Sequence, residues 1–132
     1  MKKIVLFFFI ITTLIISSLC NAQDNKPKFA MQNYFFVFLN KGQYSTKDTA
    51  ESRRLFNGHM ANIMTMFEAG KLKLAGPFMD EGKTEGIFIL DVATEEEARK
   101  LLANDPLIAI GGLDAEIRPW YGPKGLTVIP DK

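Results

Sequence analysis

The sequence predicts an α+β fold in which one antiparallel sheet of four strands is covered by two helices, in the β-α-β-β-α-β order of the ferredoxin-like fold. Three observations predict it. An aromatic, β-branched run occupies residues 34–39, apolar residues recur at helical spacing over 48–69, and the patterns strand, strand, helix, strand follow. The 132 residues suffice for one domain. The 16 basic side chains nearly balance the 15 acidic ones, so no basic surface for nucleic acid is expected.

The first strand is expected over residues 34–42, which begin with the run YFFVFL. The first helix is expected over residues 48–69, with Gly70 as its C-terminal stop. At ~100° per residue, most of its apolar side chains and one histidine fall within an arc of about 140°. That arc, which we expect to face the core, contains Leu55, Phe56, His59, Met60, Ile63, Met66 and Phe67.

Two further strands are expected over residues 72–78 and 86–92, joined by a turn rich in charge and glycine at 79–83. The last strand is expected over residues 115–120. In the ferredoxin-like order, the first and third strands are central and the other two are edges.

The second helix is expected over residues 95–103. Thr94 and Glu97 have the spacing of a capping box, which marks a helix N-terminus. Pro106 ends the helix, because the residue before a proline avoids the α region.

Both central strands are apolar on both faces, over residues 34–39 and 87–90. Two helices can cover only one face of a four-stranded sheet. A second copy of the sheet is the simplest cover for the other face, so we expect a homodimer packed face to face as a dimeric α/β barrel.

The N-terminus has the pattern of a secretory signal peptide: Lys2 and Lys3 precede residues 4–19, which carry no charge. Cleavage after Ala22 would place small residues one and three positions before the cut. The mature protein would then be exported to the periplasm or secreted, without cysteine and without a membrane segment. Two alternatives stay open, an uncleaved anchor and a lipid on Cys20, although an anchor needs ~20 apolar residues and Leu19 is not the small residue of a lipobox.

These patterns divide the chain into four parts. Residues 1–22 are the expected signal peptide and residues 23–32 a flexible lead-in. Residues 33–121 are the folded domain, and residues 122–132 an irregular tail.

His59 is the only histidine of the chain. On the apolar arc of its helix it is either a neutral core imidazole held by hydrogen bonds or a general acid or base. A lone histidine in a mature chain without cysteine offers too few ligands for zinc, so neither a metal nor another cofactor is expected.

Residues 76–84, with the sequence GPFMDEGKT, resemble a phosphate-binding loop at first sight. The two glycines enclose five residues where that motif has four, and the segment joins two strands, so no nucleotide site is expected. Trp120 and Tyr121 are either a platform for a ligand or the packing of an edge strand.

Residues 34–121 resemble the YCII-related domain proteins. The resemblance rests on an aromatic first strand and on short motifs in a fixed order, namely His59-Met60, Gly70-Lys71-Leu72, Ala75-Gly76-Pro77, Glu96-Glu97-Ala98, Asp105-Pro106 and Ile117-Arg118-Pro119-Trp120. The resemblance implies a dimeric α/β barrel and an active site of one histidine and one aspartate, which correspond here to His59 and Asp105. Relatives include enzymes that act on small chlorinated or lactone rings. The expected signal peptide, the insertion at 43–49 and the tail of this chain depart from the family pattern.

The sequence therefore favours an enzyme without a cofactor, in which His59 moves a proton on a small cyclic substrate and Asp105 orients the imidazole. Isomerase, lyase and dehalogenase chemistry all suit such a pair. Gly76, Pro77 and Trp120 are the expected substrate contacts. Two alternatives remain, a module that binds a small ligand without changing it and a structural dimer in which His59 is a core residue. Asp105 has a structural alternative too, because Asn-Asp-Pro is typical of turns.

Overall fold

The computed structural model describes residues 30–126, so the expected signal peptide, residues 23–29 of the lead-in and residues 127–132 of the tail lie outside the described residues. The elements in chain order are β1 (Met31–Lys41), α2 (Thr49–Glu68), β2 (Leu72–Pro77), β3 (Thr84–Leu90), α3 (Glu95–Ala103), α4 (Pro106–Ala109) and β4 (Leu113–Pro123). The predicted β-α-β-β-α-β order is confirmed, with the short helix α4 inserted before the last strand.

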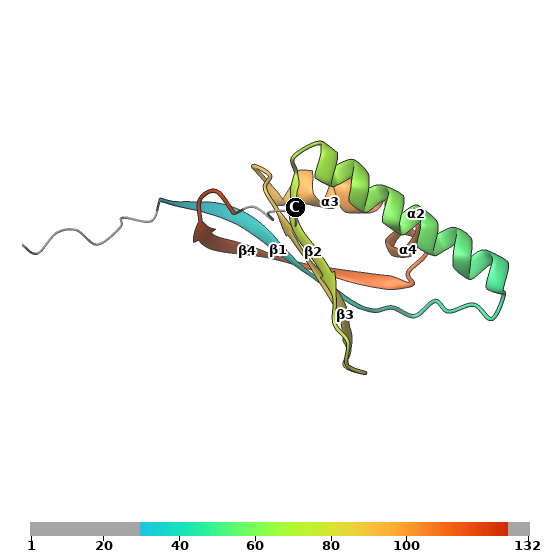
Figure 1. Ribbon diagram of the computed structural model, residues 1–132. Helices are drawn as coiled ribbons and strands as arrows, with labels where there is room; N and C mark the ends of the chain where they lie inside the picture. Colours follow the sequence, from blue (N-terminus) through green and yellow to red (C-terminus); the bar gives the residue numbers. More distant parts are fainter. Residues whose placement is uncertain (1–29, 127–132) are drawn as a thin grey trace, which may run out of the picture.

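The sheet has the strand order β2-β3-β1-β4, and every neighbouring pair is antiparallel. β1 and β3 are therefore central, as predicted for a ferredoxin-like fold. Figure 1 shows the helices on one side of the sheet, with α2 as the longest of them. Among residues 30–126, no helix lies on the other side of the sheet.

The strand register separates the two faces of the sheet. Val37 of β1 lies opposite Phe88 of β3 and Ile117 of β4, on the face that the helices cover. Its neighbour Phe38 lies opposite Ile87 and therefore points to the other face. The core between sheet and helices consists of Val37, Leu39, Met66, Leu72, Phe88, Leu90, Val92, Ala98 and Leu102.

Both ends of α2 follow from local chemistry. The side chain of Asp48 accepts hydrogen bonds from the backbone N–H groups of Ala50 and Glu51, which satisfies two free donors of the first turn. Gly70 follows the helix with φ of 70°, a left-handed conformation that glycine adopts without strain. The predicted stop at Gly70 is confirmed.

The predicted core arc of α2 is only partly correct. Leu55 and Met66 are buried, but Phe56, Met60 and Phe67 are 56%, 42% and 52% exposed. α2 contacts β2, which is an edge strand. Because no described element lies beyond β2, the outer side chains of the arc stay exposed. The buried face of α2 includes the polar residue Asn62 instead of these three apolar ones.

The first and last strands of the chain, β1 and β4, are longer than the sequence predicts. β1 begins at Met31 and β4 ends at Pro123, because the register pairs these two residues and gives their backbones hydrogen-bonding partners. The sheet thus extends two residues beyond the predicted domain at each end, into the expected lead-in and tail.

The second predicted helix is confirmed as α3, over the same residues. Thr94 Oγ1 accepts a hydrogen bond from the Glu97 N–H, and Glu97 Oε2 accepts one from the Ala93 N–H. These two bonds satisfy donors at the helix entrance in the manner of a capping box.

Candidate active site

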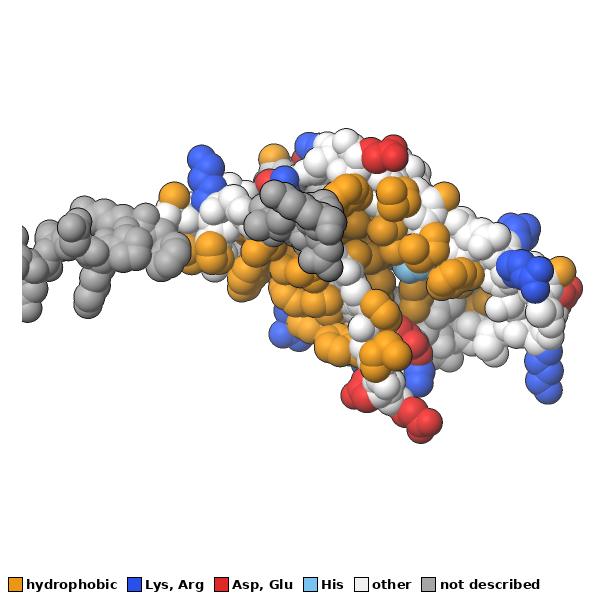
Figure 2. All heavy atoms as spheres, viewed as in Figure 1, with side chains coloured by type: hydrophobic (Ala, Val, Ile, Leu, Met, Phe, Trp, Pro, Cys, Tyr) orange, Lys and Arg blue, Asp and Glu red, His pale blue; other side chains and the backbone are white. Residues whose placement is uncertain are grey.

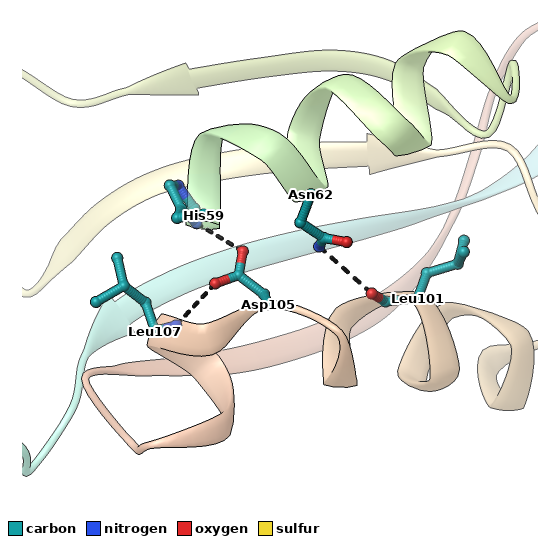
Figure 3. Close-up of polar contacts among 5 residues, drawn as sticks. All are labelled: His59, Asn62, Leu101, Asp105 and Leu107. Atoms are coloured by element: carbon teal, nitrogen blue, oxygen red, sulfur yellow. Dashed lines mark hydrogen bonds and ion pairs between the residues drawn. The ribbon is translucent and has the colours of Figure 1, made fainter. Parts of the chain in front are cut away.

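The side chains of His59 and Asp105 are in direct hydrogen-bond contact, although 46 positions separate them in the sequence. His59 lies near the middle of α2, and Asp105 is the residue that precedes α4. The distance from Nδ1 of His59 to Oδ2 of Asp105 is 2.6 Å (Figure 3). The structure thus brings together the two residues to which the family resemblance assigns an active site.

Asp105 is fully buried and uses both carboxylate oxygens. Oδ2 faces His59, whereas Oδ1 accepts a hydrogen bond of 3.0 Å from the backbone N–H of Leu107. The second bond makes Asp105 the N-cap of α4, and Pro106 holds the first helical position, where its missing N–H costs nothing. The turn and the site interpretations of this aspartate are therefore compatible.

The carboxylate partner sets the tautomer of the imidazole. An ionised carboxylate only accepts hydrogen bonds, so Nδ1 of His59 carries the hydrogen and donates it to Asp105. Nε2 of a neutral ring then keeps its lone pair. Such a nitrogen is able to accept a proton from a bound molecule.

Two aromatic rings fix the plane of the imidazole. The Phe88 ring of β3 stacks against it with centroids 6.1 Å apart and an angle of 21°. The Phe56 ring lies 6.5 Å away, one turn earlier on α2. The ring of His59 is thus held by aromatic contacts as well as by Asp105.

A cavity of about 570 Å³ opens beside His59, whose side chain remains 12% exposed. Its walls come from α2, from β2 and β3, and from the residues around the start of β4. Figure 2 shows the pale blue imidazole between hydrophobic side chains, coloured orange. His59 is therefore accessible to a small molecule, and Asp105 lies behind it, out of water.

Asn62 is a functional candidate that the sequence analysis missed. It is buried three positions after His59, and its Nδ2 donates a hydrogen bond of 3.4 Å to the backbone carbonyl of Leu101 (Figure 3). Leu101 belongs to the last turn of α3, which leads into Asp105. This contact links the two segments that carry the histidine and the aspartate. The sequence feature that could have indicated Asn62 is a polar residue within a helix rich in apolar residues.

Comparison with known families gives a match to the YCII-related domain over residues 34–121, two thirds of the chain. The chain belongs to the YCII family. Comparison with curated proteins found no match.

Among solved structures, this YCII protein is similar to 5-chloro-2-hydroxyhydroquinone dehydrochlorinase (TftG) from Burkholderia phenoliruptrix AC1100, in complex with 2,5-dihydroxybenzoquinone. The sequence identity is 18% and the TM-score is 0.48. The match covers 65% of this chain and 92% of the dehydrochlorinase.

The residues predicted to contact substrate, Gly76, Pro77 and Trp120, are divided between the two faces of the sheet. Gly76 and Pro77 of β2 line the cavity that contains His59. Trp120 does not line it: its ring packs on Tyr34 and Phe36, with centroids 5.6 and 6.1 Å apart, on the sheet face without helices. The structure therefore leaves Trp120 out of the candidate site.

Residues 76–84 form the end of β2, a turn and the first residue of β3, not a strand followed by a helix. A phosphate-binding loop requires the helix N-terminus that is missing here. The hairpin instead contributes a wall of the cavity, and Glu85 beyond it is part of the lining.

A second cavity, of about 470 Å³, lies beside α3 and β4 and has Lys41, Arg99 and Asp114 in its wall. Lys41 pairs with Glu85, and Arg99 pairs with Glu95.

Within residues 30–126, no three histidine, cysteine or acidic side chains are grouped to hold a metal ion. No helix in that range is long and apolar enough to cross a membrane.

Proposed function

We propose that this YCII protein is an acid–base enzyme that acts on a small cyclic organic compound without a cofactor. His59 transfers the proton, and Asp105 orients the imidazole and stabilises its charged form. One observation carries the proposal: the imidazole is bonded through Nδ1 to a buried carboxylate while the same ring lines an accessible cavity.

The burial of Asp105 supports a role beyond capping. Removing a carboxylate from water costs several kcal/mol unless partners compensate it. Capping α4 alone does not require burial or charge, because serine or asparagine caps a helix about as well. A buried carboxylate aimed at an imidazole is the arrangement that catalytic histidines use in hydrolases.

The geometry suits proton transfer to and from a ring. Nε2 of His59 removes a proton from a ring hydroxyl or from a carbon next to a carbonyl, and the carboxylate of Asp105 stabilises the resulting imidazolium. If the proton returns to a different carbon, the product is an isomer. If a halide departs with its bonding electrons instead, the substrate has lost one equivalent of hydrogen halide. The proton then passes from His59 to water.

A substrate screen with an active-site variant tests this proposal. Wild type is assayed with lactones, halogenated phenols and halogenated hydroquinones, and His59→Ala is then measured on any compound that is converted. We expect kcat/KM to fall by about 10²-fold or more with an unchanged circular dichroism spectrum. Asn57→Ala, an exposed position on the same helix, is the control and should retain full activity.

The competing interpretation is a module that binds the same compounds without changing them. It predicts saturable binding and no turnover in wild type across the whole screen. Equal turnover by wild type and His59→Ala would exclude His59 as the proton-transferring group.

A further inference from the structure

We infer that the His59 cavity takes an uncharged hydroxylated ring that carries an apolar substituent, in preference to a single small ring or a carboxylated one. The inference rests on the proposed function in one respect, because it places the reacting ring against His59. Size, lining and charge of the cavity lead to it.

The cavity is too large for one ring. A closed apolar cavity of ~150 Å³ already holds a benzene molecule. The cavity beside His59 measures about 570 Å³, almost four times that volume. A single six-membered ring at the imidazole would leave most of this space to water.

The space beyond the imidazole has apolar walls. Met60 and Ile63 continue the α2 wall away from His59, and Ala75 and Pro77 of β2 also line the cavity. Met60 is 42% exposed. An alkyl or aryl substituent lying between α2 and β2 would remove this apolar surface from water, which is favourable in proportion to the area covered.

The charge of the lining disfavours an anionic ligand. Glu85 is the carboxylate of the lining, and neither lysine nor arginine belongs to it. Lys41 lies outside the lining and pairs with Glu85, with Nζ and Oε1 3.6 Å apart. A ligand carboxylate would lose its water without gaining a free cation, and that exchange is costly.

A series of para-substituted rings tests the inference by binding alone. The probes are phenol, para-ethylphenol, para-butylphenol and para-butylbenzoate, with Kd measured from amide chemical-shift changes in NMR titrations of the protein. We expect the affinity of the phenols to rise by up to about fourfold for each added methylene. We expect para-butylbenzoate to bind at least about tenfold more weakly than para-butylphenol, because its charge is not compensated.

Two variants of α2 locate the substituent. Met60→Glu places a charge in the cavity wall and should abolish the gain in affinity that the butyl chain gives relative to phenol. Met64→Glu is the matched control: Met64 is 49% exposed one turn further along the helix and does not line the cavity. The chain-length dependence should persist in this variant.

His59→Ala separates this inference from the proposed function. It should lose turnover but retain the chain-length dependence of binding, so a failed activity screen would leave the binding result intact. Equal affinity along the phenol series, a benzoate as tight as the phenol, or a butyl effect that survives Met60→Glu would each overturn the inference.

Discussion

Gly58 and Pro106 meet where α2 passes α4, so closely that a Cβ atom on Gly58 would lie 2.5 Å from Cγ of Pro106. Gly58 immediately precedes His59, and Pro106 immediately follows Asp105. The lack of a side chain at one position thus permits the approach that brings the imidazole and the carboxylate within bonding distance.

Gly58→Ala is expected to reduce activity even though alanine favours a helix over glycine by about 1 kcal/mol. The added methyl group overlaps a rigid proline ring, so α4 must move away and the bond between His59 and Asp105 must lengthen. A displacement near 1 Å costs about 10²-fold in rate. The kcat/KM on a converted substrate and the Tm measure the two effects. The control is Ala61→Gly at an exposed position of the same helix, which should lower the Tm and leave kcat/KM unchanged. Full activity together with a higher Tm in Gly58→Ala would contradict the role of this contact.

Asp105→Asn is expected to separate the two roles of the aspartate. Asparagine still caps α4 through its side-chain oxygen, so the Tm should fall less than in Asp105→Ala. The amide group, however, donates to Nδ1 of His59 and forces the hydrogen onto Nε2, which is the wrong tautomer for a base. We expect kcat/KM to fall by about 10²-fold or more, as measured on the same substrate as for His59→Ala. An Asp105→Asn protein with wild-type turnover would show that the carboxylate serves α4 alone.

We propose that the protein is a homodimer built on the sheet face without helices. That face carries Phe36, Phe38 and Trp120, whose rings contact one another in the series Phe38–Phe36–Trp120. Leaving a large apolar side chain exposed to water, compared with burying it, costs roughly 1.5 to 3 kcal/mol. Light scattering after size exclusion should give twice the protomer mass for wild type and the protomer mass for Phe36→Glu. Phe67→Glu, an exposed aromatic position on α2, should remain dimeric. A wild-type monomer at micromolar concentration would refute this interface.

We also propose that the mature protein begins at Gln23 after export. N-terminal sequencing or intact mass of the protein from the cell envelope should show the loss of residues 1–22. Ala22→Phe should accumulate the uncleaved form, because signal peptidase requires a small residue there. Cys20→Ala keeps a small residue and should leave cleavage and release unchanged. Retention of wild type in the membrane and its release by Cys20→Ala would instead establish a lipoprotein.

Glu97 is expected to make a pH-dependent contribution to stability. Its hydrogen bond with Lys71, whose Nζ lies 2.9 Å away, and the hydrogen bond from the Ala93 backbone N–H hold the pKa of the carboxyl below its ordinary value. A lowered pKa in the folded state stabilises the fold at pH values above the unfolded pKa of about 4.3. This contribution is lost as the pH falls through the lower folded pKa. The Tm difference between wild type and Glu97→Gln should therefore be largest near neutrality, disappear in acid and shrink in high salt. A difference independent of pH would show that the charge of Glu97 contributes nothing.

The order of elements was predictable because it depends on local patterns. The spacing of apolar residues, the capping box at Thr94 and the stop at Gly70 each act within a few residues. The ends of β1 and β4 were not predictable in this way. Met31 and Pro123 are in strands only because each is the other's partner, and this pairing joins distant parts of the chain.

The candidate site was predictable in part. His59 stood out as the only histidine, but its pairing with Asp105 came from the family resemblance, since no periodicity relates residues 46 positions apart. Phe56 and Met60 were misassigned to the core, because the wall of a cavity and a core have the same apolar pattern in sequence. Asn62 was missed for a related reason: the rotation of α2 about its axis depends on the packing of α3 and α4, which the helix itself does not encode.

The position of β1 between β3 and β4 also affects how the chain folds during synthesis. β1 is the first described strand, and one of its two edges is filled by β4, the last. Until residues 113–123 emerge from the ribosome, β1 therefore has one row of unpaired N–H and C=O groups, next to an apolar surface. A chain truncated after Ala109 would keep that open edge permanently, and open edges recruit other chains. Such a fragment should aggregate, whereas in the same chain extended to Pro123 that edge of β1 is paired with β4.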